Sequence, residues 1–561
     1  MYAVARFLRF ASRSALRSSS HTKPTHRVSV FREIPAARFS SGSGRGSQPA
    51  RPSAASGIAA LLVGAVGWAL LGPREAHAEE RATQEEPRKI RLSEIHEHRR
   101  GADALWVFKG DRVYDITDWV PNHPGGDVIL RAAGGNVEPY WNIFTIHQKQ
   151  DVYDILEQYF VGVIDPRDLV DGRVASEQID DPFATDPERD PRLRKHSDRP
   201  CNAETPASEL GTFITPNSVF YVRNHLWVPE VSDADDHRVT VEMGDGSEKE
   251  YSVQDLRRLF KEYKVTATLQ CSGNRRAHMT AGSRPTNGLQ WDVGAIGTAE
   301  WTGVRLRDVL TDAGVPVDDL PPHIKHAQFL GAEAYGASIP IEKAVDNRGD
   351  VMLVYEMNGQ PLPRDHGYPL RVLVPGNVAA RSVKWVKRIT MSEEESTSQW
   401  QRRDYKCFGP NEGTNPDWDR ARSIQEMPVQ SAITSVEQVS TGGLKDNPAA
   451  RVYGLEEESF VLEGYAFSGG GREIVRVDVS VDNGRTWQQA DLLDNDAGGC
   501  KAWSWKQWRF STPKRQTARW FVVKAVDEAY NTQADSFEPH YNFRGNLASA
   551  WHRVPVQLAR D

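Results

Sequence analysis

The sequence predicts a multidomain α+β protein, with a small α+β domain, a larger mixed α+β domain and a C-terminal immunoglobulin-like β-sandwich. Three observations support this fold class. The 561 residues, 39% of them hydrophobic, are enough for several packed cores. Helix and strand patterns alternate through the centre of the chain. Near the C-terminus, valines alternate strictly with polar residues, which is typical of a strand with one buried face.

Net charge and cysteine content exclude several classes of protein. The formal net charge is −7, and the chain after its first 80 residues has no long run of lysine and arginine, so nucleic-acid binding is not expected. The sequence has neither a Gly-x-Gly-x-x-Gly fingerprint nor a Walker loop, so dinucleotide and ATP binding are not supported. A disulfide framework or a zinc site is also unexpected, because no Cys-x-x-Cys pair occurs among Cys201, Cys271, Cys407 and Cys500.

Residues 1–80 have the composition of a targeting and sorting segment. From Met1 to Arg32 they contain six arginines and many serines but no acidic residue, as in a mitochondrial presequence. The apolar stretch from Gly57 to Leu71 is short and rich in glycine for a membrane span. We therefore expect a sorting signal that is removed near residues 76–80, with a retained membrane anchor as the alternative. This two-part signal predicts the mitochondrial intermembrane space.

Residues 85–165 are predicted to form a small α+β domain that binds haem. Trp106–Asp115 contain a Gly-Asp turn between two strand-like runs. His123 opens a His-Pro-Gly-Gly motif, and His147 follows an apolar and aromatic segment. Two imidazoles on separate elements are what a six-coordinate haem iron requires, and glycines let the backbone approach the ring. The segment resembles the cytochrome b5 family, which implies a heme b with His123 and His147 as axial ligands.

Residues 166–209 are predicted to be a linker. They are acidic, contain repeated Asp-Pro pairs and show little apolar periodicity. A mobile tether would let a haem move between two docking sites. For the part after Pro191, an ordered strap on the next domain is an equally good interpretation.

Residues 210–420 are predicted to form a mixed α+β domain, with a strand at Val265–Leu269, a helix around Leu306–Leu310 and a buried strand at 351–355. Directly after the first of these strands, the sequence sets the Cys271 thiol beside two arginines. A thiolate is a soft ligand suited to a transition metal, and arginines lower a thiol pKa and hold oxyanions. A buried, inert cysteine is the alternative interpretation.

This region resembles the molybdopterin-binding domain of the sulfite oxidase family, which includes the eukaryotic nitrate reductases. The similarity rests on four separated segments, which are Tyr221–His225, Leu269–Arg276, Arg364–Arg371 and Arg381–Trp385. It implies a Mo-molybdopterin cofactor with Cys271 as the thiolate ligand of molybdenum. The residues implied to hold the pterin and its phosphate are Tyr221, Val222, Arg223, Asn224, His225, His366, Arg371, Ser382, Val383 and Lys384. Cationic and neutral donors of this kind suit an anionic cofactor.

The same resemblance implies a pocket for the small oxyanion sulfite. The residues implied for it are Arg223, Arg276, Arg553, Trp291 and Tyr405. Arginine supplies a planar fork whose charge does not titrate, although a surface or inter-domain ion pair is the alternative for each arginine. Arg553 lies near the C-terminus and would have to fold back to reach the site. The family also has an acidic pterin contact near Glu333, where the loop of this chain is shortened.

Residues 421–561 are predicted to form the immunoglobulin-like sandwich. Every second residue from Val475 to Val481 is valine, and an Asn-Gly turn follows at 483–484. The tryptophans at 503, 505 and 508 are interpreted as core residues, with carbohydrate binding as the weaker alternative. In the sulfite oxidase family this domain forms the homodimer interface.

Taken together, the resemblance implies molybdenum-dependent oxidation of sulfite to sulfate, with electrons passed through the haem to cytochrome c. Residues 85–165 carry fourteen acidic and nine basic residues, which suits a basic partner and predicts a salt-dependent rate. A nitrate-reductase-type enzyme is one alternative, but we find no flavin or nicotinamide module to supply its electrons. A non-catalytic haem electron carrier is the other, and it is disfavoured because Cys271, His366, Arg371 and Lys384 are all present.

Overall fold

The computed structural model describes the chain from residue 86 onward, with short interruptions. The described residues are 86–120, 123, 126–143, 145–148, 150–174, 181–409, 411–413, 416–440, 458–493, 499–514 and 519–556. The predicted targeting segment, residues 1–80, lies outside them, as do Pro124 and Gly125 of the His-Pro-Gly-Gly motif. No helix within the described ranges is long and apolar enough to cross a membrane.

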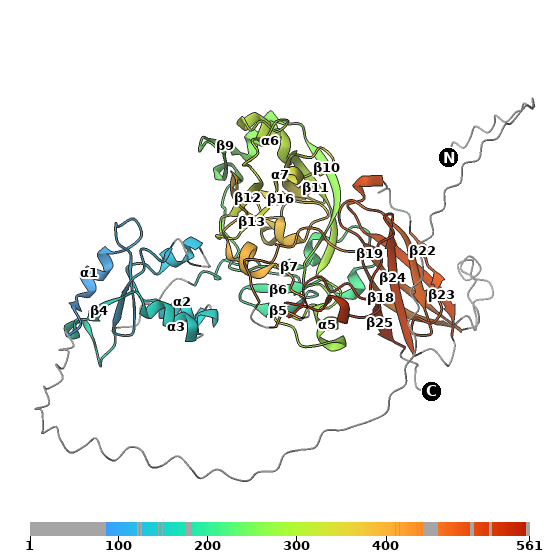
Figure 1. Ribbon diagram of the computed structural model, residues 1–561, viewed down its shortest axis with the longest axis horizontal. Helices are drawn as coiled ribbons and strands as arrows, with labels where there is room; N and C mark the ends of the chain where they lie inside the picture. Colours follow the sequence, from blue (N-terminus) through green and yellow to red (C-terminus); the bar gives the residue numbers. More distant parts are fainter. Residues whose placement is uncertain are drawn as a thin grey trace, which may run out of the picture. The chain divides into compact units, whose positions relative to one another are not determined.

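The N-terminal domain, drawn in blue and cyan in Figure 1, is built on a four-stranded sheet of order β1-β4-β3-β2. Its elements are β1 (Lys89–Ile90), α1 (Leu92–Glu97), β2 (Trp106–Lys109), β3 (Arg112–Asp115), α2 (Glu138–Ile143), α3 (Gln150–Glu157) and β4 (Phe160–Ile164). The predicted turn joins β2 to β3, and Gly110 adopts φ +61° there. One apolar cluster includes Trp141 of α2 and Leu156 of α3, whereas a second includes Ile95 of α1. The domain therefore has its own core.

Part of the segment predicted as a linker belongs to a small sheet. β5 (Arg194–Asp198) and β6 (Cys201–Glu204) form an antiparallel pair, and β6 also pairs with β7 (Val222–Arg223). Upstream of them, Arg189 forms two hydrogen bonds to the Asp365 carboxylate, of 2.9 and 3.0 Å. After Pro191 the chain is thus an ordered strap on the central domain, which was the second of the two interpretations.

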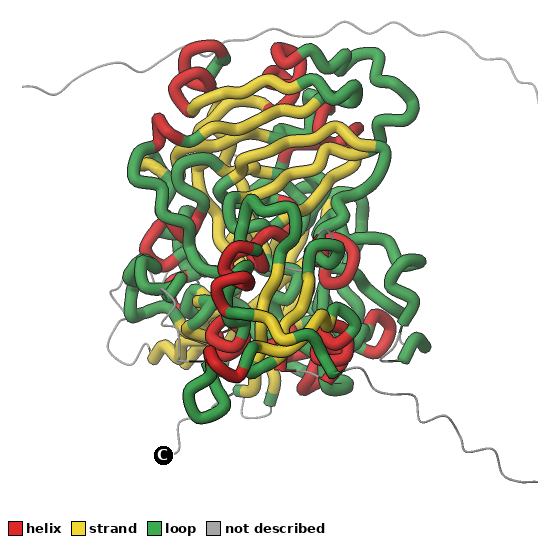
Figure 2. Tube along the Cα trace, turned by 90° about the vertical axis from the view of Figure 1, so that its left-hand side faces the viewer, coloured by secondary structure: helices red, strands yellow, loops and turns green. Residues whose placement is uncertain are grey.

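The central domain contains two five-stranded sheets. One has the order β10-β11-β14-β15 with β16 also on β14, and the other has the order β13-β12-β17-β8-β9. Figure 2 shows many of these strands stacked across its upper part, with helices at their margins. The strands are β8 (Arg238–Glu242), β9 (Glu248–Ser252), β10 (Tyr263–Gln270), β11 (Ile296–Arg305), β12 (His326–Gly331), β13 (Gly336–Pro340), β14 (Met352–Met357), β15 (Gln360–Pro361), β16 (Arg371–Leu373) and β17 (Val386–Ser392).

Short helices complete this domain. They are α4 (Val253–Leu259), α5 (Arg276–Gly282), α6 (Leu306–Ala313) and α7 (Ile341–Val345). Helix α4 starts with a capping box between Ser252 and Asp255, and α6 ends at Gly314, whose φ of +107° favours glycine. The main apolar cluster joins strands of both sheets to α4, α6 and α7. The strand predicted at 265–269 and the helix predicted at 306–310 lie within β10 and α6, and the strand predicted at 351–355 overlaps β14, which begins one residue later, so all three are confirmed.

The C-terminal region contains two four-stranded antiparallel sheets, β18-β19-β23-β22 and β21-β20-β24-β25. Their strands are β18 (Gln430–Ser440), β19 (Glu458–Phe467), β20 (Ile474–Ser480), β21 (Gln488–Gln489), β22 (Asp491–Leu492), β23 (Lys506–Pro513), β24 (Trp520–Asp527) and β25 (His552–Pro555). One apolar cluster contains side chains from both sheets, as in a sandwich. Within β20, Val477 and Val479 are buried, but the prediction of one common buried face was wrong for Val475, which is 43% exposed. A register shift between Ile474 and Arg476 accounts for this difference.

Trp503, Trp505 and Trp508 are buried, so the carbohydrate-binding interpretation of these three residues is wrong. Each belongs to a different apolar cluster, and only Trp508 lies in the core of the sandwich. The indole N–H of Trp503 donates to the Asp350 carboxylate at 2.9 Å, and that of Trp505 donates to the Phe213 carbonyl at 3.0 Å. Trp503 and Trp505 therefore join the sandwich to the central domain.

Candidate functional site

Cys271 is the first residue of a tight turn between β10 and α5. It follows the last residue of β10, and its backbone N–H donates to the Ala295 carbonyl at 2.9 Å. The chain then turns through Arg275, which has φ +63°, into α5. The Gly273 N–H points to the Cys271 sulfur, at 3.4 Å. The thiol is 6% exposed and lines a pocket of the central domain.

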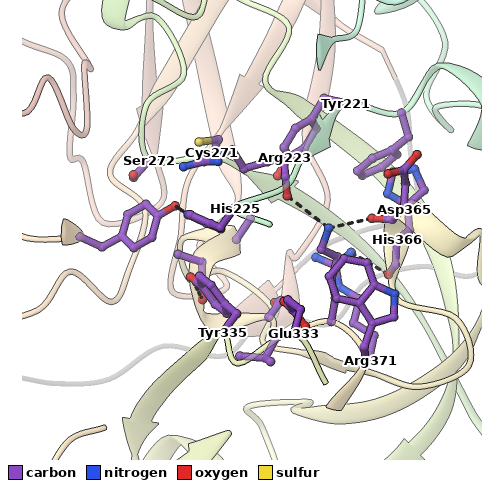
Figure 3. A pocket seen from close by; sticks show the side chains of 18 residues that line it. Tyr221, Arg223, His225, Cys271, Ser272, Glu333, Tyr335, Asp365, His366 and Arg371 are labelled. Carbon is purple, nitrogen blue, oxygen red and sulfur yellow. Dashed lines mark hydrogen bonds between the residues drawn. The ribbon is translucent and has the colours of Figure 1, made fainter. Parts of the chain in front are cut away.

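Most of the residues predicted to hold the pterin meet in this pocket. Figure 3 shows Cys271 and His225 on one side of it and His366 and Arg371 on the other. The predicted site residues that line it are Tyr221, Arg223, His225, Cys271, His366, Arg371, Ser382, Val383, Lys384 and Tyr405. Val222 and Asn224 are buried beside it in the same segment. Four segments that are far apart in the sequence are thus brought together.

The lysine, arginine and histidine side chains of the pocket lie in a dry environment, in which the His366 imidazole is neutral at pH 7. Burial lowers the pKa of Lys384 to about 7, that of Arg371 to about 10 and that of His366 to about 3. Such shifts mean that the charged forms lose hydration without a matching gain from anions. An anionic group in the pocket would restore that balance.

Two buried polar atoms also indicate that the pocket holds a polar ligand. Among the described residues, Arg371 Nε and Glu333 Oε2 have no hydrogen-bond partner, although both side chains line the pocket. Burial also raises the pKa of Glu333 to about 8, so this carboxyl is a potential hydrogen-bond donor at neutral pH. Unused donors and buried cations around one thiol fit a pterin with a phosphate and a soft metal.

A second set of side chains fixes the cations. Lys384 Nζ donates to the Asn224 side-chain oxygen and to the Asp365 carbonyl, the latter at 2.8 Å. Asn224 Nδ2 in turn donates to the Asp365 carboxylate at 2.8 Å, and Arg189, just before the strap, binds the same carboxylate. Arg223 Nη1 donates to the Asn224 carbonyl at 2.6 Å. This network sets the direction of each cation before any ligand binds.

Tyr405 and His225 form a pair on the Cys271 side of the pocket, across from His366 and Arg371 (Figure 3). Tyr405 follows a π-helix, η10 (Trp400–Asp404), and π-helices are frequent at functional sites. The Tyr405 hydroxyl and His225 Nε2 lie 2.9 Å apart and share a hydrogen bond. Burial lowers the pKa of His225 well below its usual value, so the imidazole is neutral. The Tyr335 ring stacks on it at 4.7 Å, which fixes its orientation.

Arg276 and Trp291 lie behind the thiol and do not line the pocket. Arg276 is 7% exposed, and its guanidinium donates to the Leu289 carbonyl at 2.8 Å and to the Arg544 carbonyl at 2.9 Å. Trp291 is buried in the same apolar cluster as Cys271, with its ring against His196. The anion-binding role of Arg276 stays a prediction.

Arg553 does not reach the pocket, contrary to the sequence prediction. It lies on β25, where it donates to the Asp535 carbonyl at 2.7 Å and contacts Asn483. The arginine of this region that approaches the site is Arg544, which forms an ion pair with Asp404, the residue before Tyr405. Sequence reasoning missed it because neither arginine lies in a periodic pattern. An arginine followed by glycine in a polar loop was the available signal.

The two predicted haem ligands face each other in the N-terminal domain. The His123 and His147 rings lie 6.1 Å apart between centroids and are nearly parallel, at 16°. An ion bonded to one nitrogen of each ring at roughly 2 Å fits this spacing. His147 lies in the 3₁₀ helix η3 (Thr145–Gln148), and the Trp141 ring stacks on its imidazole, with 5.4 Å between the ring centroids. The geometry fits a bis-histidine haem.

Three family models match successive parts of the chain. The cytochrome b5-like heme/steroid binding domain matches residues 91–165, and the oxidoreductase molybdopterin binding domain matches residues 225–400. The Mo-co oxidoreductase dimerisation domain matches residues 421–559. These matches confirm the predicted fold class and the haem and molybdopterin cofactors, and they support a homodimer.

Known proteins extend this similarity to most of the chain. The sulfite oxidase of Gallus gallus is 46% identical over 481 residues, which are 83% of this chain and 99% of the relative. The mitochondrial sulfite oxidase of Rattus norvegicus is 43% identical over 85% of this chain and 86% of its own length. The crystal structure of the sulfane dehydrogenase SoxCD from Paracoccus pantotrophus aligns with a TM-score of 0.51 at 25% identity and covers 70% of this chain and 99% of its own. The chain therefore belongs to the sulfite oxidase family.

Proposed function

We propose that this protein oxidises sulfite to sulfate in the Cys271 pocket and passes the electrons through the haem to cytochrome c. The observation that carries the proposal is the set of buried cations around a single thiol, with donors left unused. When bound, the molybdenum cofactor supplies a centre that takes up two electrons while sulfite gains an oxygen atom from water. The overall change releases two protons and one sulfate per sulfite.

One group of pocket residues would hold the cofactor, and a second group would bind sulfite. Cys271 would bind the metal, and Arg371, Lys384 and His366 would hold the pterin and its phosphate through charge-assisted hydrogen bonds. Glu333 is buried, and its pKa is raised to about 8, so it would donate a hydrogen bond to the pterin in its protonated form. Ser382 fixes its own segment, because its hydroxyl accepts from the Val374 N–H at 3.0 Å.

Sulfite would bind between Arg223 and Tyr405, which both line the pocket. The Arg223 guanidinium would offset the charge of the anion. The Tyr405 hydroxyl would orient it, since the neutral His225 imidazole holds this hydroxyl in place. Arg276 would add positive potential from behind, because a buried charge acts over several ångströms with little screening. Arg544 is half-buried and paired with Asp404, so it would add less.

The partners and the location follow from other parts of the chain. His123 and His147 would hold the haem iron and leave no position for a substrate, so this domain would transfer single electrons. The excess of acidic residues in this domain suits a basic acceptor such as cytochrome c. The relatives named mitochondrial and the basic segment at residues 1–32 support a mitochondrial protein, which we place in the intermembrane space. The C-terminal domain would form the homodimer.

A steady-state assay of the full chain with sulfite and ferricytochrome c tests this proposal. We expect two cytochromes to be reduced for each sulfite consumed, with sulfate as the product. Turnover of nitrate with a reduced dye, without oxidation of sulfite, would instead favour the nitrate-reductase alternative. Absence of molybdenum and of both activities would favour a simple haem carrier.

A further inference from the structure

A loop of the C-terminal domain is bound directly to the turn that carries the thiol. The Leu547 N–H donates to the Ser272 carbonyl at 2.7 Å. The Asn546 side-chain oxygen accepts from the Ser272 hydroxyl at 2.9 Å and from Arg276 Nη2 at 3.1 Å. Ser272 follows Cys271, and Arg276 starts the next helix, so both ends of the turn are held by one amide oxygen.

The other half of the same amide reaches the Tyr405 segment. Asn546 Nδ2 donates to the Lys406 carbonyl at 3.2 Å, one residue after Tyr405. Asn546 is only 1% exposed, and all its polar atoms are used within the protein. A single buried side chain therefore links the thiol turn to the segment that carries the substrate-orienting hydroxyl.

The loop itself is rigid where it makes these contacts. The Asn542 side chain accepts from the Asn546 N–H at 3.0 Å and donates to the Asn546 carbonyl at 2.9 Å. Gly545 has φ +59°, and a Cβ at this position would lie 2.6 Å from Cγ of Arg276. Only glycine allows the loop to lie this close to the arginine side chain.

We infer that Asn546 is a positioning residue, which sets the location of the Cys271 thiol relative to the Tyr405 hydroxyl. The placement of the thiol follows from the hydrogen bonds alone, whereas the catalytic consequence rests on the function proposed above. Misplacement of reacting groups by about 1 Å costs up to a hundredfold in rate. The competing view is that Asn546 only joins two domains, in which case its loss lowers stability and nothing else.

Gln533 provides a matched control. It is also a buried amide of the C-terminal region, 4% exposed, with a full set of hydrogen bonds. Its partners all lie within that region, and they are Ser431, Ala525, Ser549 and Ala550. Gln533→Leu should therefore destabilise the domain about as much as Asn546→Leu does, without moving the thiol.

The first test uses the cofactor-free full chain and does not depend on activity. We expect Asn546→Leu to raise the rate of Cys271 alkylation by iodoacetamide about tenfold, because the turn loses hydrogen bonds that hold it closed. Mass spectrometry of the peptides measures this rate, with the exposed Cys500 as internal reference. Gln533→Leu should leave it unchanged. Equal rates in wild type and Asn546→Leu would overturn the positioning role.

The second test separates the two halves of the amide in the loaded enzyme. Asn546→Asp keeps oxygens for Ser272 and Arg276 but loses the donor to the Lys406 carbonyl. We expect its alkylation rate to match wild type while kcat for sulfite falls about tenfold, as a misplaced Tyr405 predicts. An unchanged kcat would remove Tyr405 from the inference. If the wild type does not oxidise sulfite at all, the proposed function fails, and the alkylation result still stands.

Discussion

The two cofactor sites are assembled from very different lengths of chain. His123 and His147 come from one small domain, and their rings face each other across 6.1 Å. The pocket around Cys271 draws on β7, the end of β10, the loop before β13 and the segments up to Tyr405. The first site needs only neutral imidazoles, whereas the second buries several cations. The difference teaches that a neutral metal site can be built locally, but a site for a charged cofactor needs a wide supporting network.

The two sites should therefore fail independently, and Cys271→Ser gives the largest expected effect. Loss of the thiolate should lower sulfite-dependent turnover at least about a thousandfold, which is the scale for an essential group of a catalytic unit. The haem absorbance should not change, because the haem ligands lie in a domain with its own core. Stopped-flow spectroscopy measures the haem absorbance and the rate at which sulfite reduces the haem. Retained turnover would contradict the role of this thiol as metal ligand.

The converse change is His147→Ala. It should abolish the low-spin haem spectrum and lower cytochrome c reduction about a hundredfold or more, because the electron outlet is lost. Sulfite oxidation with an artificial acceptor should persist. The exposed neighbour Gln148 offers the control, since Gln148→Ala should keep both activities. Loss of the artificial-acceptor activity in His147→Ala would show that the two sites are not modular.

The cost of burying charge in the pocket can be measured at Lys384, as a change in the free energy of unfolding with pH. Burial lowers its pKa from 10.5 to about 7, so between these values the unfolded chain holds a proton that the folded chain lacks. The stability of the cofactor-free protein should therefore rise with pH across this window, by on the order of 3 kcal/mol. Urea unfolding at pH 7 to 10 measures this rise. The rise should shrink by this amount in Lys384→Met, where Lys343, whose pKa burial lowers to about 8, still adds a smaller rise, and it should persist in full in Lys387→Met. A rise that is undiminished in Lys384→Met would assign it to another group.

The smallest effect concerns the two arginines of the C-terminal region. Arg544→Gln should raise the KM for sulfite about tenfold, because a charge beside the Tyr405 segment is lost and Asp404 is left unpaired. Arg553→Gln should change the KM less than about twofold, since its partners Asp535 and Asn483 lie outside the pocket. Steady-state kinetics with an artificial acceptor decides between them. A larger rise in KM for Arg553→Gln than for Arg544→Gln would instead support the sequence prediction that Arg553 binds sulfite.

Much of the architecture was predictable from the sequence, because its signals are local. The haem ligands lie in a recognisable segment, and the strands at β10 and β14 follow their apolar runs. Other features depend on contacts between distant segments. The bulge that exposes Val475 and the choice of Arg544 over Arg553 could not be predicted from periodicity, since neither leaves a periodic trace. The hydrogen bonds of Asn546 to the Ser272 and Lys406 segments also join residues far apart in the sequence, so no local pattern predicts them.

The buried tryptophans of the C-terminal region have a thermodynamic consequence. Because Trp503 and Trp505 belong to apolar clusters shared with the central domain, neither domain can unfold without exposing part of the interior of the other. Denaturation of the two should be one cooperative event, whereas the haem domain, with separate clusters, should melt on its own. In a calorimeter the chain would then behave as two units rather than three.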